Sequence, residues 1–578
     1  MDSNEVIIRV GGAAGDGVQS AGLIIAKGFS SNGLHTNMYN YYQSIIRGGQ
    51  SWYQIRASSH AVKNQGDGLD ILIALNKDAL ERHTNPDINE GGASPLNGIA
   101  IYDSSISGFT KHDGMKFCEM PLSEIAQKYS KNTLLKNTVA IGAVFGYLSM
   151  DFEILAGVIR DQFGGKGKIA EQNVVAAREG YGHFVEKYGK SAKTLTGSGK
   201  KYYLISGGES AGLGATRNGL KAYFGYPMTP ASSIIHYLAS HSKEFKVFVK
   251  ITEDEISAIN MAIGANYAGI RAMTGSSGGG FALMTEAVGM AAEMEIPIVI
   301  YEAQRAGPST GLPTKTEQGD LLQVIGASQG DFPKAIFSPR NVEETYYMTG
   351  EALNLAEKYQ MPVFLMVDLY LAEHYETVEK FNLESDMIKA PLASGDEKDY
   401  KRYRFTEDGI SLRAIPGTRN LMHNEDSDEH DEKGDVVSDA VTDPQIRKKI
   451  MEKRMKKLET YMKEISPTPT YKMDDAEYAL ILWGSTQGAV EEAVDLLRKK
   501  GIKIGAIEVN KPFPVNPDIA KLTKGKKKVI FVENNYTGQL RRIISSEIQV
   551  TGDLITKYDG ECFYPGALAN EIEARIKE

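Results

Sequence analysis

Short runs of β-branched and aromatic residues alternate with helix-like segments along most of the 578-residue chain. Typical runs are "EVIIRV", "IPIVIYEA", "MPVFLMVD" and "KKVIFVENN". Runs of this length between helical segments indicate β-α-β units, which form parallel sheets covered by helices on both faces. The chain is also too long for a single hydrophobic core. The sequence therefore predicts an α/β protein made of several open α/β domains.

The expected domain boundaries follow changes in composition along the chain. We expect an α/β domain over residues 1–192, a linker over 193–201 and a second α/β domain over 202–375. Residues 376–470 are rich in charge and are expected to form an excursion with a docked helix. The apolar residues of that helix lie at near-helical spacing: Ile450, Met455, Leu458 and Met462. A smaller α/β domain is expected over 471–578.

The composition argues against several classes of protein. A net charge of −9 argues against a nucleic-acid binder, and no apolar run has the length of a membrane span. The N-terminal segment lacks the features of a signal peptide, so we expect a cytoplasmic protein. With only Cys118 and Cys562, the chain alone cannot ligate an iron–sulfur cluster. His423 and His430 stand among carboxylates, but exposed acidic loops usually bind no metal, and we expect none.

A glycine-rich turn, "GGAAGDG" (11–17), joins the first predicted strand to the first predicted helix. Its glycines do not follow the GxGxxG pattern, and no acidic residue stands where a dinucleotide-binding protein holds the ribose. Backbone N–H groups at a helix start can still bind phosphate. Gly12, Gly15 and Gly17 are therefore candidates for a phosphate-binding loop, for example for coenzyme A. The alternative is a tight strand-to-helix turn.

The stretch "GYPMTPASS" (225–233) contains two prolines, Pro227 and Pro230, with two residues between them. Thr229 is a good N-cap, and Pro230 suits the first position of a helix that continues from Ile234. We expect a helix to start here. Its first N–H groups are free, so the stretch is either a simple helix cap or one wall of an anion-binding site.

Two further segments of the second domain carry polar groups at strand ends. Glu253 and Glu255 precede a helix of small and apolar residues, where a partly desolvated carboxylate could hold or pass a proton. The alternative is two first-turn acids that complement the helix dipole. In "QRAGPSTGLPTKTEQGD" (304–320), Arg305 and nearby hydroxyls such as Thr310 have the chemistry for binding a carboxylate.

Together these motifs resemble 2-oxoacid:ferredoxin oxidoreductases. "GYPMTPASS" is similar to the YPITPSS signature of their pyrimidine-binding domain, with Met228 and Ala231 as departures, and "RAGPSTGLPTKTEQGDL" is similar to a segment of their α subunits. "GGAAGDGVQSAG" and "SIIRGGQS" resemble the γ subunit, while "LILWGST", "NKPFPVN" and "VENNYTGQL" resemble the transketolase C-terminal-like domain. The resemblance spans nearly the whole chain and implies a fused γ–α subunit.

The resemblance implies a role for each matching residue. Glu255, with Glu253 as the runner-up, matches the catalytic glutamate that hydrogen-bonds the aminopyrimidine of thiamine diphosphate. Tyr226 and Pro227 would contact that cofactor. Thr229 would hydrogen-bond the substrate carboxylate or the adduct on the thiazolium ring. Arg305 and Thr310 would bind the carboxylate of the 2-oxoacid.

The resemblance also implies cofactors and partners. The reaction is the coenzyme A-dependent oxidative decarboxylation of a 2-oxoacid, 2-oxoglutarate or pyruvate, with electrons passed to ferredoxin. Mg²⁺ with the diphosphate and a [4Fe–4S] cluster would lie on a β subunit. The two "GDG" motifs of this chain, at 15–17 and 66–68, lack the context of a Mg²⁺-diphosphate site, and we expect no such site here. An (αβ)₂ heterotetramer is implied. The alternatives are an indolepyruvate-type oxidoreductase and a non-catalytic coenzyme A- or nucleotide-binding protein.

Overall fold

The computed structural model describes residues 4–45, 48–85, 95–164, 167–193, 195–388, 390–437 and 443–578. Ile46 and Arg47 of the "SIIRGGQS" motif lie outside these residues. The chain forms two compact units. Unit 1 comprises 1–206, 373–381 and 564–568, and unit 2 comprises 207–372, 382–563 and 569–578. No helix of the described residues is long and apolar enough to cross a membrane.

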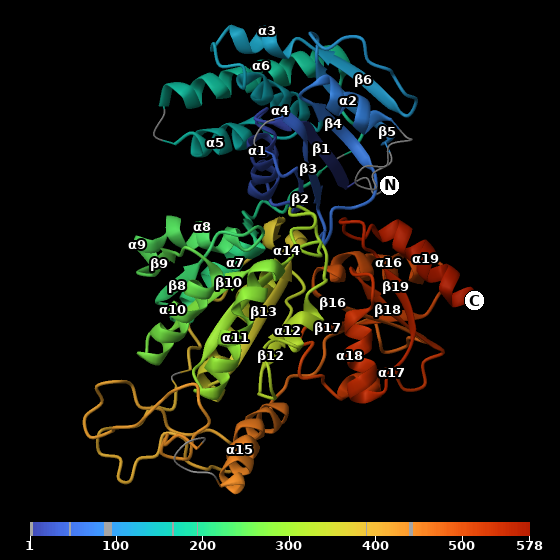
Figure 1. Ribbon diagram of the computed structural model, residues 1–578. Coiled ribbons are helices and arrows are strands. Elements are labelled where there is room, and N and C mark those ends of the chain that lie inside the picture. Colours follow the sequence, from blue (N-terminus) through green and yellow to red (C-terminus); the bar gives the residue numbers. More distant parts are fainter. Residues whose placement is uncertain are drawn as a thin grey trace. The chain divides into compact units, whose positions relative to one another are not determined.

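Unit 1 contains an eight-stranded mixed sheet of order β6-β5-β4-β1-β3-β2-β14-β7 (Figure 1). Strands β1, β4, β5 and β6 run parallel, and the others pair antiparallel. The strands are β1 (Glu5–Ala14), β2 (His35–Tyr41), β3 (Gly48–Ser58), β4 (Leu69–Ala74), β5 (Pro95–Asp103), β6 (Met115–Met120), β7 (Tyr203–Ser206) and β14 (Tyr375–Val378). The second domain was expected to begin at residue 202, but β7 pairs with β14 in the sheet of unit 1.

The helices of unit 1 cover its sheet. They are α1 (Val18–Ser31), α2 (Lys77–Thr84), α3 (Leu122–Gln127), α4 (Leu135–Tyr147), α5 (Phe152–Gln162) and α6 (Gly167–Tyr188). Residues of α1, α4, α5 and α6 form one apolar core with the sheet, including Ile24, Phe145 and Ile159. The alternation of short apolar strands and helices thus gives the expected α/β layers.

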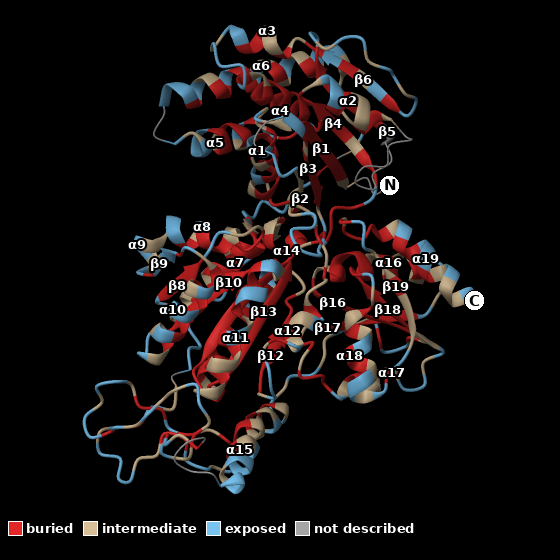
Figure 2. Cartoon of the chain, in the orientation of Figure 1, coloured by how far each residue is buried: buried red, intermediate tan, exposed pale blue. Residues whose placement is uncertain are grey.

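Unit 2 contains a six-stranded sheet of order β12-β13-β11-β10-β8-β9, in which every pair is parallel. The strands are β8 (Ala222–Gly225), β9 (Phe248–Ile251), β10 (Ala272–Ser276), β11 (Ile298–Gln304), β12 (Ala335–Phe337) and β13 (Pro362–Asp368). The helices around it are α7 (Gly207–Arg217), α8 (Ser232–Ser240), α9 (Ser242–Phe245), α10 (Glu255–Tyr267), α11 (Gly278–Glu293), α12 (Leu321–Ile325), α13 (Val342–Tyr359) and α14 (Leu369–Glu373). All residues of β11 and β13 are buried, as their largely apolar sequences predict, and Figure 2 shows this for β13.

A second, five-stranded sheet of order β15-β17-β16-β18-β19 belongs to the same unit. Its elements are β15 (Thr470–Tyr471), β16 (Tyr478–Trp483), α16 (Gln487–Lys499), β17 (Ile504–Val509), α17 (Asp518–Thr523), β18 (Lys528–Glu533), α18 (Gln539–Ile548), β19 (Asp553–Thr556) and α19 (Pro565–Lys577). One apolar cluster contains residues of both sheets, among them Ile300, Phe364, Trp483 and Phe531. The mixed α/β architecture with several sheets agrees with the fold class expected from the sequence.

The docked helix of the charged excursion is α15 (Pro444–Met462), but it does not dock through its apolar stripe. Ile450 is buried as expected, whereas Met455, Leu458 and Met462 are only partly buried. The other buried residues are Lys453, Arg454, Lys457 and Tyr461. The apolar stripe therefore predicts the buried face of α15 only in part. The buried cations form ion pairs with Glu293 at the end of α11 and with Glu295 just after it, both far away in the sequence.

Glu295 is the centre of these contacts. It is fully buried, and its carboxylate lies 2.6 Å from the Nζ atoms of both Lys453 and Lys457. Burial acts to raise the pKa of Glu295, but the two lysines hold it well below its usual range. Burial lowers the pKa of Lys457 to about 7 in spite of Glu295. Removing one member of such a buried ion group leaves an uncompensated buried charge and destabilises the fold.

Candidate functional site

Three loops of the second domain follow three neighbouring parallel strands. The "GYPMTPASS" loop follows β8, the "SSGGG" turn follows β10, and the Arg305 loop follows β11. In the sheet these strands stand side by side in the order β11-β10-β8. Their carboxyl ends meet at one edge, which is where open parallel sheets bind ligands.

Of the two candidate carboxylates, Glu255 faces the interior and Glu253 faces solvent. Glu255 is 4% exposed and is the first residue of α10, whose N-cap Asp254 accepts a hydrogen bond from the Ser257 N–H. Glu253 is exposed and accepts a hydrogen bond from the Ser257 hydroxyl at 2.8 Å. The geometry therefore favours Glu255 as the functional group of the pair.

Glu255 packs against the glycine-rich start of α11. Its Oε1 accepts a hydrogen bond from the Ser276 hydroxyl at 3.3 Å. A Cβ atom on Gly280 would lie 2.3 Å from that oxygen and 2.1 Å from Ser276 Oγ, whereas a Cβ on Gly279 would meet nothing within 4 Å. Glycine at position 280 therefore makes room for the carboxylate.

The "GYPMTPASS" loop reaches the same place. Met228 Sδ lies 3.8 Å from Ser276 Oγ, and the carbonyl of Thr229 accepts a hydrogen bond from Arg305 Nη1 at 2.9 Å. The prediction that Thr229 caps a helix with Pro230 at its first position is wrong. Helix α8 begins at Ser232 after Ala231, with no side-chain cap, because Thr229 and Pro230 belong to the preceding turn.

The remaining predicted residues are exposed. Tyr226 is 39% exposed, and Pro227 beside it is exposed as well. Thr310 lies at the exposed tip of a loop that is closed by hydrogen bonds between Ala306 and Lys315 and between Leu312 and Ala306. The single chain thus brings Glu255, Thr229 and Arg305 to one edge, while Thr310 stands on the loop above the strand end.

Two acids at this edge, the buried Glu302 and the half-buried Asp320, were not among the residues expected from the sequence. Glu302 is fully buried near the end of β11, directly beside Ser276 in the sheet register. Asp320 precedes α12, and a Cβ on Gly278 would lie 2.5 Å from its Oδ2. An acid at the end of an otherwise apolar strand, "IPIVIYEA", was the signal that could have drawn attention to Glu302.

In unit 1 the glycine-rich turn is held by side chains. Gly12 lies in β1, and Gly15 and Gly17 have φ values of 101° and 78°. Asp16 accepts hydrogen bonds from the Ala13 N–H and the Asn76 amide, both at 2.9 Å. These contacts describe a tight strand-to-helix turn that leaves the first N–H groups of α1 uncapped by a side chain.

A cavity of about 250 Å³ lies beside this turn. It is lined by Gly17, Ser20 and Ile24 of the first helix region, by residues of α4 and α6, including Asn137, and by Phe163, which follows α5. Asn137 donates from its amide to the Asp16 carbonyl at 2.7 Å, and its buried Oδ1 has no hydrogen-bond partner among the described residues.

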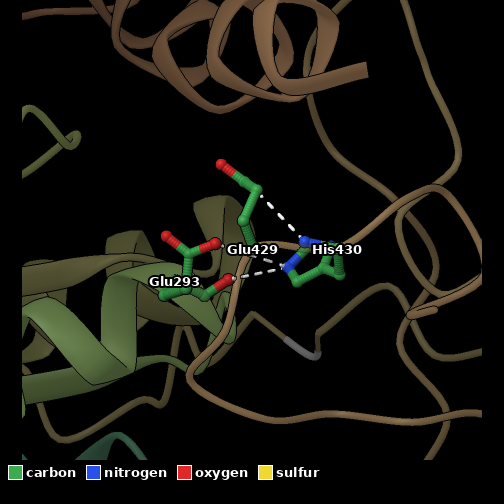
Figure 3. Close-up of side chains that lie close together, drawn as sticks. All are labelled: Glu293, Glu429 and His430. Carbon is green, nitrogen blue, oxygen red and sulfur yellow. Dashed lines mark hydrogen bonds and ion pairs between the residues drawn. The ribbon is translucent and has the colours of Figure 1, made fainter. Parts of the chain in front are cut away.

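The acidic excursion brings a candidate metal-ligand set together. Ligand atoms of Glu293, Glu429 and His430 lie within 4.8 Å of one another (Figure 3). However, Arg454 Nη2 donates to Glu293 at 2.6 Å and to Glu429 at 3.0 Å, and the His430 ring stacks on Tyr403. The guanidinium thus places a positive charge between the two carboxylates.

The comparisons with known proteins cover the whole chain. Three family models match: "Pyruvate ferredoxin/flavodoxin oxidoreductase" over residues 7–183, "Pyruvate flavodoxin/ferredoxin oxidoreductase, thiamine diP-bdg" over 213–452 and "Pyruvate:ferredoxin oxidoreductase core domain II" over 476–567. A Sulfolobus 2-oxoacid:ferredoxin oxidoreductase subunit alpha is 31% identical and is matched over 98% of this chain and 96% of its own length.

Two further relatives are similar over almost their full length. The 2-oxoglutarate oxidoreductase subunit KorA of Mycobacterium tuberculosis is 31% identical, covering 99% of this chain and 91% of the relative. A 2-oxoglutarate:ferredoxin oxidoreductase from Magnetococcus marinus, solved with 2-oxoglutarate, coenzyme A and succinyl-CoA bound, is 32% identical with a TM-score of 0.92 and covers 100% of both chains. With its thiamine diphosphate-binding domain and these full-length relatives, the chain belongs to the 2-oxoacid:ferredoxin oxidoreductase family of enzymes, as a protein of the alpha-subunit type.

Proposed function

We propose that this chain is the fused γ–α subunit of a 2-oxoacid:ferredoxin oxidoreductase that works with a β subunit. The complex converts a 2-oxoacid and coenzyme A to acyl-CoA and CO₂, and its two electrons leave one at a time for ferredoxin. The observation that carries the proposal is the buried Glu255, which packs against Gly280 beside the exposed Gly279. These glycines follow β10, the strand next to β11, after which Arg305 stands. The Magnetococcus relative and the KorA relative favour 2-oxoglutarate, with pyruvate as the second candidate.

The residues fit the pyrimidine half of thiamine diphosphate. When bound, this cofactor supplies a carbanion that attacks the keto carbon and accepts the electrons released with CO₂. The Glu255 carboxylate is shielded from water and is held in place by the Ser276 hydroxyl. It can hydrogen-bond the pyrimidine ring nitrogen and accept or return the proton of that nitrogen. Tyr226 and Pro227 form the exposed side of the same edge and would contact the cofactor.

The substrate carboxylate is assigned to the Arg305 side of the edge. Arg305 is fixed by the Thr229 carbonyl, and a guanidinium fixed in this way binds a carboxylate with defined geometry. The Thr229 hydroxyl can donate to the same carboxylate. Thr310 joins the site when its exposed loop packs against the substrate or the β subunit.

The β subunit is assigned the Mg²⁺-diphosphate site and the [4Fe–4S] cluster. In this chain Asp16 is hydrogen-bonded within its own turn, and Asp67 accepts from the Gly566 N–H at 2.8 Å. The two cysteines are buried, and burial raises the pKa of Cys118 to about 11. Strand β9 and helices α10 and α11 carry exposed apolar side chains that are suited to contact a partner. These side chains are Phe248, Ile251, Ile256, Met261 and Leu283. An (αβ)₂ heterotetramer would contain two such sites.

Coenzyme A is assigned as the co-substrate. Gly12, Gly15 and Gly17 belong to the turn that presents the N-terminus of α1, where a phosphate group would be stabilised. The neighbouring cavity with the unpartnered Asn137 Oδ1 offers an acceptor for a further polar group of the ligand.

Reconstitution tests the function. The chain purified alone should be inactive, and it should oxidise 2-oxoacids with thiamine diphosphate, coenzyme A and ferredoxin only after a cysteine-bearing β subunit is added. A panel of 2-oxoglutarate, pyruvate and indolepyruvate identifies the substrate. Activity of the chain alone, or coenzyme A binding without activity in the complete complex, would contradict the proposal; the second result would favour a non-catalytic binding protein.

Gly280→Ala should lower kcat/KM of the complex about 100-fold, because the new Cβ displaces Glu255 from its position against α11. Gly279→Ala is the matched control, since its Cβ meets nothing within 4 Å, and its activity should stay near that of the wild type. Circular dichroism of both variants checks that α11 is intact. Equal losses in the two variants would show that the effect is not due to Glu255.

A further inference from the structure

Glu302 is a buried carboxyl that no role above uses. It is 0% exposed, and neither of its carboxylate oxygens has a hydrogen-bond donor among the described residues. An ionised carboxylate in this position would be both desolvated and unsatisfied, which is costly. Burial accordingly raises the pKa of Glu302 well above its usual range.

The neighbour of Glu302 is another acid, Asp320. The Asp320 N–H donates to Gln304 Oε1 at 3.0 Å, and Gln304 is two residues from Glu302 on the same side of β11. This places the Asp320 carboxyl within hydrogen-bonding reach of Glu302, and burial raises the pKa of Asp320 to about 6. Two ionised carboxylates have only acceptors, so the contact becomes a hydrogen bond only when one of them carries a proton. With the Glu302 hydroxyl donating to Asp320, the pair is satisfied and carries a single negative charge.

The charges around this pair come from three elements. Arg305, at the end of β11, is the cation that acts on both carboxyls. Glu317, in the loop before Asp320, is half-buried, and burial raises its pKa to about 7. Glu255 approaches from α10 through Ser276, the register neighbour of Glu302.

Arg305 therefore has two competing sets of acceptors. One is the Thr229 carbonyl, 2.9 Å from Nη1, and the other is the pair of Glu302 and Asp320, with which Arg305 interacts electrostatically. With one proton on the pair, a single charge balances the guanidinium. Without that proton, two desolvated negative charges would attract it more strongly, and the electrostatic interaction is strong because the site is dry.

We propose that Glu302 and Asp320 share one proton and that this proton positions Arg305 toward Thr229 and the substrate carboxylate. Glu302 is thus a positioning residue that acts through Arg305. Loss of the proton moves Arg305 toward the pair and weakens substrate binding. This inference rests on the proposed function for its kinetic test but not for its spectroscopic one.

Glu302→Gln is the variant that separates this role from packing, because its amide still donates to Asp320 and cannot lose a proton near neutral pH. In the wild-type complex, KM for the 2-oxoacid should rise about tenfold per pH unit above the pKa of the pair, with much smaller changes in kcat. In Glu302→Gln, KM at neutral pH should equal the wild-type value and this rise should be absent. Glu317→Gln is the matched control and should keep the rise.

A measurement on the same complex without substrate tests the shared proton itself. Infrared spectroscopy should detect a protonated carboxyl at neutral pH that disappears in Glu302→Gln and remains in Glu317→Gln. Absence of that band, or identical KM profiles for the wild type and Glu302→Gln, overturns the inference. If the band is present but the complex oxidises no 2-oxoacid, the shared proton is supported. The proposed function and the role of Glu302 in positioning the substrate are then refuted.

Discussion

Glu255→Gln is expected to lower kcat/KM of the reconstituted complex about 1,000-fold, in the range that loss of a positioned acid–base group produces. The substitution keeps the size of the side chain and can still accept from Ser276, so the fold should persist. What it removes is the negative charge that stabilises a protonated ring nitrogen in a buried place. Steady-state assays of 2-oxoacid-dependent ferredoxin reduction measure the effect.

Glu253→Gln is the matched control for this experiment. Glu253 is two residues away, is exposed, and its contact with the Ser257 hydroxyl is on the surface. Its activity should stay within about twofold of the wild type, as for most exposed substitutions. If Glu253→Gln inactivates the complex while Glu255→Gln does not, the assignment of the two glutamates is reversed.

Glu295→Gln is expected to destabilise the protein by about 3–5 kcal/mol, the usual cost of removing one partner from a buried ion group. The neutral amide would leave Lys453 and Lys457 buried with no carboxylate between them. The midpoint of urea unfolding, followed by circular dichroism, measures the change in the free energy of unfolding.

The control for this stability measurement lies on α15, the helix that carries Lys453 and Lys457. Glu459 forms an exposed pair with Lys456 at 2.6 Å, so Glu459→Gln should leave the midpoint of urea unfolding close to the wild-type value. Similar unfolding midpoints for Glu295→Gln and Glu459→Gln would mean that α15 is not held by its buried charges.

The sequence predicts well what depends on local patterns. The continuous apolar runs of β11 and β13 identify buried parallel strands, and the glycine-rich turn before α1 marks a strand-to-helix connection. The resemblance to the family also selected Glu255, and its burial supports that choice.

The sequence fails where distant residues decide the outcome. Lys453 and Lys457 look like surface residues, and only Glu295, more than 150 positions earlier, makes their burial tolerable. Thr229 looks like a helix cap, but its carbonyl is used by Arg305, 76 positions later. Glu302 reads as part of an apolar strand, and its pairing with Asp320 depends on how the loop before α12 folds back.

The position of Glu295 gives α15 an influence beyond its own docking. Glu295 stands between the end of α11 and the start of β11, and these two elements carry the glycine surface and Arg305 at their other ends. Releasing α15 would leave a buried negative charge at this junction without its two lysines, so the junction could not stay buried unchanged. Local opening of the excursion and loosening of the strand and helix that carry the site are thereby thermodynamically linked.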